Sequence, residues 1–413
     1  MSIIPNISAR QHYDVIIVGA GISGLAAALY FALEGYIVLS VDHLPVHDIS
    51  LPKGGWGDKR STDNSRTVAI LGKSVQFLRK LGIDIAKDVH GATPVNGLHL
   101  YESGDYKSIC KGTLQKAAFY PNHQGVFGYH VHNSQLYTSM LRLVLQNDMI
   151  TLLDNTSITY QQCQSERVIV GLSNGKHVSS RLIVAADGRS SITRDRLGIT
   201  TWLKTFNQSV ALCTVRHHEP HNNIVSEIYE SGGPLTFIPS GISNYHSSIV
   251  WVDVVRHIKR LSCMNDPDFC DALEKRSGNL YSGLNLVSPR NYLFSLFVML
   301  ARSVIGVRSV LIAESAHVFP PVGAQGLNMS LRDIDALSIL TSKKDDDSDH
   351  DIGSQKLLLR YQQNRKQAIV PMMMMINAMN YMSGRSGIIA SSLRSTCLKI
   401  AAKLHKEGIL LHK

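Results

Sequence analysis

The sequence predicts an α/β protein: a Rossmann-like domain interrupted by a mainly antiparallel sheet domain, with a helical C-terminal region. Three observations support this fold class. An apolar strand leads into a glycine-rich turn and a helix near the N-terminus, and a second strand–loop–helix unit lies late in the chain. Alternating strand patterns fill much of the sequence between them. A chain of 413 residues is also large for one core, which favours an interrupted arrangement.

The N-terminal unit carries the G-x-G-x-x-G pattern at Gly19, Gly21 and Gly24, after a β-rich run that begins at Tyr13. Gly19 permits the tight turn, Gly21 lets a pyrophosphate approach the backbone, and Gly24 allows close packing of helix on strand. A second strand ends at Asp42, about twenty residues further on, where a ribose-binding carboxylate is expected. The whole unit predicts a dinucleotide site, against the alternative of a glycine-rich turn without a ligand.

The late unit runs from an apolar strand, Val310 to Ala313, through a Pro-Pro pair and two glycines into a helix that ends near Leu340. Such a helix start presents unpaired backbone N–H groups and favours negative charge. An ordinary strand–loop–helix connection is the alternative. Glu314 and His317 lie directly after the strand.

A third stretch, Arg181 to Gly198, is a strand ending in the turn Asp187-Gly188, followed by a basic helix start. Together the three stretches resemble the FAD-dependent aromatic monooxygenases of the p-hydroxybenzoate hydroxylase type. Within that family the chain looks most like the ubiquinone-biosynthesis hydroxylases, whose late motif is similar to Pro321 to Asp333. The resemblance extends from about Tyr13 to Leu340, with a weaker echo at Leu359 to Arg365.

The resemblance implies a monooxygenase that binds FAD and hydroxylates an aromatic ring of a polyprenylated phenol in ubiquinone biosynthesis, through a flavin C4a-hydroperoxide. It implies O₂ and an external reductant, NAD(P)H or a redox protein, as further partners. Other proteins of quinone synthesis are candidate partners. The alternatives are an FAD epoxidase or isoprenoid reductase of the same fold, or a weakened, non-catalytic scaffold of a quinone-synthesis complex. A flavin halogenase is less favoured because the three tryptophans form no W-x-W pair.

The resemblance also implies roles for individual residues. Backbone N–H groups from Gly323 to Asn328 are suited to stabilising negative charge on the reduced flavin, and Pro321 supports their loop. Asp187 and Glu314 are expected to face the ribityl chain. An arginine in the position of Arg66 lies over the flavin in similar proteins, although a solvated arginine is an equal alternative. The expected FAD-binding residues are Gly19, Gly21, Gly24, Asp42, Arg66, Gln135, Asp187, Glu314, Pro321, Gly323, Ala324, Gln325, Gly326, Leu327 and Asn328.

No catalytic side chain is assigned, because the flavin carries the chemistry in the resembled family. His317 is expected to stabilise the loop rather than to act as a base. The chain departs from similar proteins at Ala313-Glu314, where they have Gly-Asp, at His132 to Ser134, and at Ser226 to Tyr229. The first departure adds a methyl near the cofactor and lengthens the carboxylate, so FAD is expected to bind more weakly or shifted.

Domain boundaries follow from these motifs and from the strand patterns. Residues 65–82 are helical by spacing, and Phe237 and Trp251 fit core packing better than pocket lining. The expected FAD-binding domain comprises 12–90, 128–200 and 291–341. The expected substrate domain comprises 91–127 and 201–290. Residues 342–354 form an acidic linker and 355–413 a helical C-terminal region.

Composition excludes several classes of protein. The six scattered cysteines contain no C-x-x-C pair, which argues against a metal or disulfide framework and for a reduced, cytoplasmic compartment. No signal peptide or long apolar run is visible, and the aspartates at 345–351 lack the glycine and glutamate of a calcium loop. The net charge of +10 is best explained as diffuse solvated charge, and no nucleic acid partner is expected.

The C-terminal stretch from Ser392 to Lys406 has an apolar helical face, with basic residues largely on the other faces. Packing of that face against the body of the protein is the simpler expectation. Peripheral attachment to an anionic inner membrane is the alternative.

Overall fold

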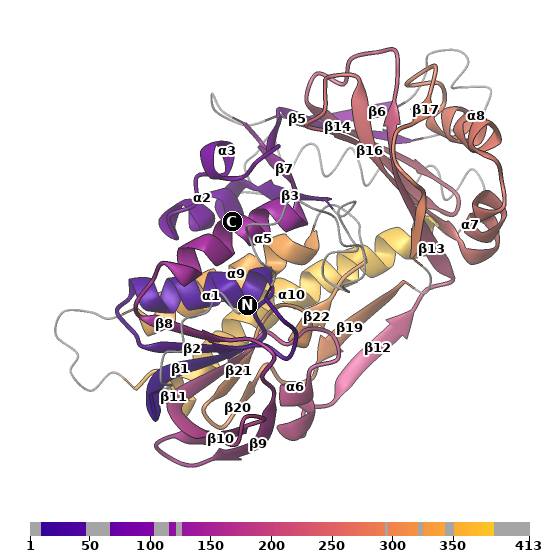
Figure 1. Ribbon diagram of the computed structural model, residues 1–413. Coiled ribbons are helices and arrows are strands. Elements are labelled where there is room, and N and C mark those ends of the chain that lie inside the picture. The colour runs from indigo at the N-terminus through magenta and orange to yellow at the C-terminus, as the bar shows by residue number, and fades with distance from the viewer. Residues whose placement is uncertain are drawn as a thin grey trace.

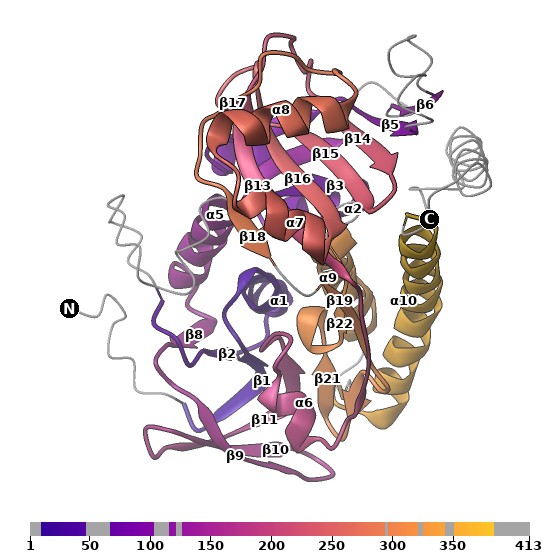
Figure 2. The same ribbon diagram turned by 90° about the vertical axis from the view of Figure 1, so that its right-hand side faces the viewer.

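The computed structural model describes residues 10–46, 67–102, 115–120, 126–293, 296–320, 325–342 and 351–383. Two sheet regions are stacked along the molecule, with a helical layer between and beside them (Figures 1 and 2). The expected segments 392–406, most of the acidic linker, Arg66 and the loop residues Pro321, Gly323 and Ala324 lie outside the described residues.

The lower region is a sheet with the order β20-β21-β11-β1-β2-β8, and the five strands from β21 to β8 are parallel. A hairpin of two further strands extends it antiparallel from β11. Parallel strands covered on both faces read as continuous apolar runs, which is why β1 and β2 gave strong strand signals. The strands are β1 (His12–Val18), β2 (Val38–Val41), β8 (Ile150–Leu153), β9 (Ile158–Cys163), β10 (Val168–Leu172), β11 (His177–Ala185), β20 (Ile305–Gly306) and β21 (Ser309–Leu311).

Helix α1 (Ile22–Leu33) lies between α5 (Asn133–Leu145) and α9 (Gln325–Thr341), and α10 (Gln355–Ser383) packs on α9. Residues 24–32 of α1 are all buried. The small alanines among them let the neighbouring helices approach closely. The Tyr30 hydroxyl donates to the Ser338 carbonyl oxygen at 2.8 Å, and the Tyr36 hydroxyl donates to that of Thr341 at 2.8 Å. These bonds fix the end of α9 against the first βα unit.

A small sheet of β3 (Thr67–Leu71), β7 (Gly128–His132) and β4 (Thr93–Val95) lies beside α9, with α2 (Gly72–Lys80) and α3 (Ile85–Asp88). The expectation of a helix over 65–82 is wrong in its first part, because Thr67–Leu71 is strand β3. These residues include β-branched side chains and pair with β7 in register, so tertiary pairing overrides the helical spacing. Helix α2 begins only at Gly72.

The upper region is an eight-stranded sheet in which seven strands follow the order β17-β13-β16-β15-β14-β5-β6 and the eighth, β18, pairs with β13. The β14–β5 pair is parallel, whereas the other pairs are antiparallel, which confirms a mainly antiparallel second sheet. The strands are β5 (Gly97–Glu102), β6 (Gln115–Phe119), β13 (Gln208–Arg216), β14 (Ile224–Glu230), β15 (Gly233–Pro239), β16 (His246–Val254), β17 (Asn285–Leu286) and β18 (Asn291–Leu293).

Helices α7 (Val255–Ser262) and α8 (Asp266–Ser277) cover the outer face of this sheet, away from α5 and α9 (Figure 1). Phe237 and Trp251 are buried in the cluster beneath them, which confirms their expected core role. Helix α8 is capped at its N-terminus by Asn265, whose side chain accepts a hydrogen bond from the Asp268 N–H at 2.8 Å, and at its C-terminus by Gly278 in a left-handed conformation.

A ribbon of β12 (Thr201–Thr205), β19 (Phe297–Ala301) and β22 (His317–Val318) connects the two regions. Asp351, expected in a solvated linker, is instead held by Arg308 through two bonds of 2.8 and 2.7 Å. The guanidinium of Arg308 is buried, and its fork matches the carboxylate. Among the described helices, none is both long and apolar enough to cross a bilayer.

Candidate functional site

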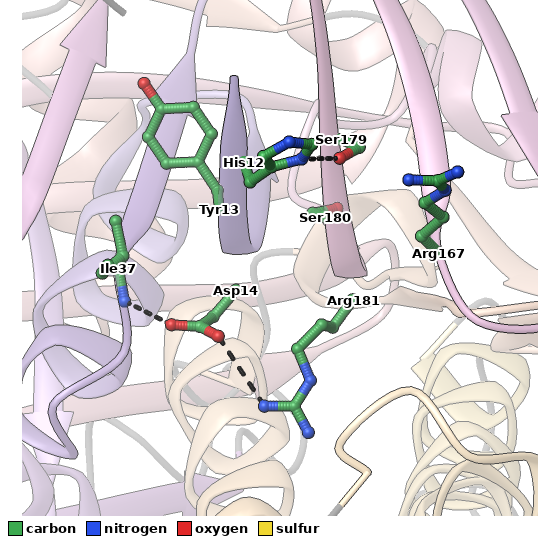
Figure 3. A pocket seen from close by; sticks show the side chains of 8 residues that line it. All are labelled: His12, Tyr13, Asp14, Ile37, Arg167, Ser179, Ser180 and Arg181. Carbon is green, nitrogen blue, oxygen red and sulfur yellow. Dashed lines mark hydrogen bonds and ion pairs between the residues drawn. The ribbon is translucent and has the colours of Figure 1, made fainter. Parts of the chain in front are cut away.

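One pocket of about 350 Å³ opens at the amino-terminal edge of the parallel sheet (Figure 3). Within it Asp14 accepts a hydrogen bond from the Ile37 N–H at 2.9 Å and lies 3.7 Å from Arg181. The pocket surrounds the start of β1, whereas the glycine-rich turn follows its end. It is therefore distinct from the site that the sequence predicts. The remaining lining residues are His12, Tyr13, Arg167, Ser179 and Ser180.

The predicted site lies at the opposite edge, where four parallel strands end together. Val18 pairs with Val41 on one side and with Ala185 on the other, and Ala185 pairs with Leu311. Gly19 and Asp42 directly follow two of these strand ends, and Asp187 and Ala313 lie two residues beyond the other two. Ligands of open α/β sheets bind outside such carboxyl ends.

The three glycines of the first turn have different structural roles. Gly19 has φ = +100°, and a Cβ there would lie 2.5 Å from the Ala186 carbonyl oxygen. A Cβ at Gly24 would overlap the Gly19 carbonyl oxygen. A Cβ at Gly21 meets no atom within 4 Å, and Gly21 is the N-cap of α1 without a capping side chain. The turn itself requires the outer two glycines, while the middle one leaves open space at a helix N-terminus.

The two aspartates at strand ends are engaged by the protein. Asp42 is buried and accepts from the Ala20 N–H at 2.6 Å and the Leu44 N–H at 2.9 Å, so it braces the glycine turn. Asp187 accepts from the Ser191 hydroxyl at 2.5 Å and the Thr193 N–H at 3.0 Å. It thereby fixes the start of α6 (Ile192–Arg196). Each carboxylate has further lone pairs with which it could meet a ligand hydroxyl.

Glu314 extends into solvent at this edge and meets Arg189. Both its carboxylate oxygens accept from that guanidinium, at 3.2 Å each, and both side chains are about half exposed. An exposed pair of this kind contributes little stability, so it can rearrange at small cost. Its role toward a ribityl chain stays a prediction.

Ala313 has φ = +55°, the left-handed conformation that favours glycine. The resemblance noted from the sequence expects glycine at this position. An alanine in the left-handed conformation costs about 1 kcal/mol of backbone strain. A hydrogen bond keeps the backbone in this conformation: the Ala313 N–H donates to Asp333 Oδ2 at 2.8 Å. Residues 313–315 form the short helix η1.

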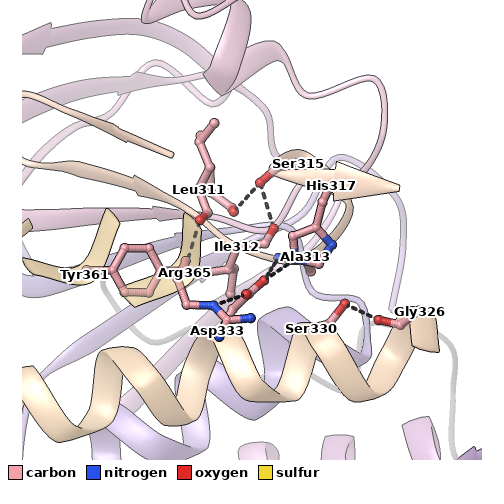
Figure 4. A network of polar contacts seen from close by, with 11 residues as sticks. Leu311, Ile312, Ala313, Ser315, His317, Gly326, Ser330, Asp333, Tyr361 and Arg365 are labelled. Atoms are coloured by element: carbon pink, nitrogen blue, oxygen red, sulfur yellow. Dashed lines mark hydrogen bonds and ion pairs between the residues drawn. The ribbon is translucent and has the colours of Figure 1, made fainter. Parts of the chain in front are cut away.

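Asp333 is the centre of a buried polar network (Figure 4). It also accepts from His317 Nε2 at 2.6 Å and from Arg365 Nε at 2.7 Å. Burial raises the pKa of Asp333, but the charges of His317 and Arg365 and the hydrogen bonds lower it by more, so the pKa lies below its usual range. His317 is only 2% exposed and is committed to this carboxylate. Its geometry agrees with the expected structural role.

Sequence reasoning did not assign roles to Asp333, Tyr361 or Arg365. The signal was present, because Asp333 ends the late motif and the other two lie in the weaker echo at 359–365. Tyr361 is buried and its hydroxyl donates to the Leu311 carbonyl oxygen at 3.3 Å. Helix α10 thus anchors the end of β21 from outside the motif.

Helix α9 begins at Gln325, directly before the second glycine of the late unit. The Asn328 side chain accepts from the Leu71 N–H at 3.0 Å and donates to the Ala69 carbonyl oxygen at 2.7 Å, which ties α9 to β3. A Cβ at Gly326 meets nothing within 4 Å, and Leu327 packs on the main core. Gln135 lies half-buried in the first turn of α5, beside α1.

The chain is similar to known proteins along most of its length. The profile described as "FAD binding domain" matches residues 12–375. Ubiquinone hydroxylase UbiL of Rhodospirillum rubrum is 27% identical over 80% of this chain and 72% of its own length. Ubiquinone hydroxylase UbiM of Neisseria meningitidis is 24% identical over 85% and 73%. The structure of PqsL, a probable FAD-dependent monooxygenase from Pseudomonas aeruginosa, superimposes with a TM-score of 0.71 at 17% identity, covering 95% and 99%.

The chain belongs to the FAD-binding monooxygenase family. Its cofactor is FAD, and its fold is the one expected from the sequence.

The residues at the carboxyl edge fit this cofactor. Space beyond Gly21 is open, and the first turn of α1 contains no acidic residue that would oppose a pyrophosphate. Open space also lies beyond Gly326, at the start of α9. The protein therefore offers two helix N-termini to the anionic parts of the flavin dinucleotide.

Gly21→Val is expected to abolish FAD retention, because its side chain would take the space left for the pyrophosphate. Gly21 has a φ of −71°, which valine adopts without strain, so the apo-protein should melt as the wild type does. Bound FAD is measured by absorbance after denaturation. Leu33→Ala, on an exposed part of the same helix, is the control and should keep its FAD. Normal FAD content in Gly21→Val would contradict this placement.

Asp333→Asn is expected to lower the free energy of unfolding by about 3–5 kcal/mol at neutral pH, because Arg365 would keep a buried charge without its partner. Folding lowers the pKa of Asp333, so the stability it contributes is present above its unfolded pKa and is lost as the pH falls through the folded pKa. The difference between wild type and variant should therefore shrink in acid. Urea denaturation of the FAD-bound proteins measures both effects.

The matched control is Asp335→Asn, two residues along the same helix and half-buried. It should change stability by less than about 1 kcal/mol. An equal loss of unfolding free energy in the two variants would contradict the central role of Asp333 in the network.

Proposed function

We propose that this monooxygenase hydroxylates an aromatic ring of a polyprenylated phenol in ubiquinone biosynthesis. The relatives named as ubiquinone hydroxylases cover most of the chain and support this substrate class. O₂ and an external reductant are the co-substrates. When bound, FAD supplies the transfer of one oxygen atom from O₂ to the ring, while the second leaves as water with the reductant's electrons.

One observation carries the proposal: the inner face of the upper sheet is apolar and only partly buried. Its outer face is packed under α7 and α8, whereas inner-face residues such as Leu98, Leu212, Ile238 and Val250 are half-buried. This face is turned toward the helical layer and the FAD edge (Figures 1 and 2). A polyprenylated phenol is mostly hydrocarbon, and such a surface would exclude water from it.

The chain's own residues have defined tasks in this proposal. The N–H groups at the start of α1 hold the pyrophosphate, and Asp42 meets the ribose. Asp187 and Glu314 face the ribityl chain. The start of α9, from Gln325 to Asn328, stabilises negative charge on the reduced ring system.

A non-catalytic scaffold is the second candidate, and two departures favour it. Ala313 takes a conformation suited to glycine, and Glu314 pairs with Arg189. Both weaken the fit to FAD relative to a Gly-Asp sequence. The decisive difference between the candidates is turnover, which a scaffold lacks.

Glu314→Ala is expected to raise the dissociation constant of FAD about fivefold, since one hydrogen bond contributes roughly 1 kcal/mol. Fluorescence titration of apo-protein with FAD measures it. Arg189→Ala is the matched control, because it removes the same ion pair but leaves the carboxylate, and FAD should bind it no more weakly. Unchanged affinity in Glu314→Ala would show that this carboxylate does not face the ribityl chain.

Cells that lack this protein and hold no second hydroxylase should accumulate an under-hydroxylated quinone precursor. Mass spectrometry of lipid extracts detects it. The wild-type gene should restore the quinone, and a gene for Gly21→Val should not. Restoration by Gly21→Val would favour the scaffold, and normal quinone without the protein would reject both candidates.

A further inference from the structure

A carboxyl group interrupts the apolar inner face of the upper sheet. Strand pairing aligns one row of residues across six strands of this sheet, and Glu227 is the only charged member of the row. The neighbours on either side are Thr236 and Leu100. The row is Leu212, Val250, Thr236, Glu227, Leu100 and Ala117.

Glu227 is on the inner face because the strand alternates. Its neighbour Ile228 is buried with Phe237 and Trp251 in the cluster under α7 and α8. Tyr229 points the same way as Glu227 and packs with Leu100 and Phe119 in a separate inner cluster. Successive side chains of a strand point to opposite faces. The carboxyl therefore faces the side that the proposed function assigns to the aromatic substrate.

The carboxyl of Glu227 has few hydrogen bonds for a buried group. Glu227 is 4% exposed, and among the described residues its hydrogen-bond partner is Tyr229, whose hydroxyl donates to Oε1 at 3.0 Å. Burial raises the pKa of Glu227 to about 7, and the bond from Tyr229 offsets part of that rise. Burial likewise raises the pKa of Tyr229 well above its usual range.

Charged neighbours do not explain this environment. On β15, Thr236 and Ile238 share the inner face, and on β5 Leu98, Leu100 and Glu102 alternate to it. Of these five only Glu102 titrates, and as a second acid it supplies no compensating positive charge. Burying a carboxylate without a neighbouring cation costs several kcal/mol of folding free energy. A Glu–Tyr pair with a purely structural role would not account for keeping the carboxyl there.

We propose that Glu227 and Tyr229 bind the hydroxyl group of a phenolic substrate and that Glu227 accepts its proton. This inference rests on the proposed function. The phenol O–H bond breaks, the proton passes to a Glu227 carboxylate oxygen, and the electron pair remains on the phenolate oxygen. That oxygen enriches the ring carbons at which an electrophilic oxygen atom is transferred. Tyr229 holds the carboxyl in place and acts as a positioning residue.

The test measures how tightly the FAD-bound protein binds two probes, a short-chain prenylphenol and its methyl ether, from about pH 5.5 to about pH 8.5. The change in flavin absorbance reports binding. Wild-type affinity for the phenol should rise as the pH passes through the pKa of Glu227, because the ionised carboxylate is the acceptor. Affinity for the ether, which has no proton to donate, should stay constant.

Glu227→Gln should bind the phenol roughly ten- to a hundredfold more weakly above pH 7, the range for one charge-assisted hydrogen bond, and without pH dependence. Its affinity for the ether should match the wild type. Tyr229→Phe should keep the pH dependence with a shifted midpoint. Ser226→Ala is the matched control, because this buried hydroxyl is adjacent in the strand but contacts Tyr101 and Tyr281 on the outer side.

Folding of the variant is checked by its melting temperature. The folded-state pKa of Glu227 is raised, so wild-type stability falls as the pH rises through about 7. Glu227→Gln should therefore melt above the wild type in mild base and close to it in acid.

Two results overturn the inference in different ways. Equal, pH-independent binding of phenol and ether by the wild type would reject the role of Glu227, while the proposal of an aromatic site on this face would stand. Retention of FAD without binding of either probe would reject the proposed function together with this inference.

Discussion

The buried carboxylate of Asp333 is the interaction on which the FAD edge depends. It joins the strained backbone of Ala313, the histidine of β22 and the arginine of α10 in one network. Three donors around one ion are needed, because an unpaired charge in this position would be far too costly. The end of β21 and the middle of α9 are therefore held at a fixed position relative to each other, although no continuous secondary structure joins them.

Sequence patterns predicted the first βα unit well because its physics is local. A Cβ at Gly24 would clash with Gly19, five residues away, and Val15 to Val18 form a continuous apolar run. Gly19 also meets the distant Ala186, but its positive φ is already a local requirement of the turn. The same reasoning predicted the carboxyl edge, since strands of one parallel sheet end together. The mainly antiparallel second sheet could likewise be predicted from alternation.

Long-range partners could not be predicted in this way. The helical spacing of 65–82 concealed strand β3, whose identity depends on pairing with β7 and on the Asn328 side chain. Asp351 looked like a linker residue, but Arg308 lies 43 positions away in the sequence. Glu227 was visible only as a departure from similar proteins. Its face could be assigned once the strand register was known.

The two faces of the upper sheet have different roles. Its outer face is closed by α7 and α8 around Trp251. Its inner face is partly open and largely apolar, and it retains the buried carboxyl of Glu227 at an energetic cost. Selection for stability alone removes such groups, since an apolar side chain of similar size is usually as stable or more so. A carboxyl kept there is best explained by a partner that the folded chain itself does not contain.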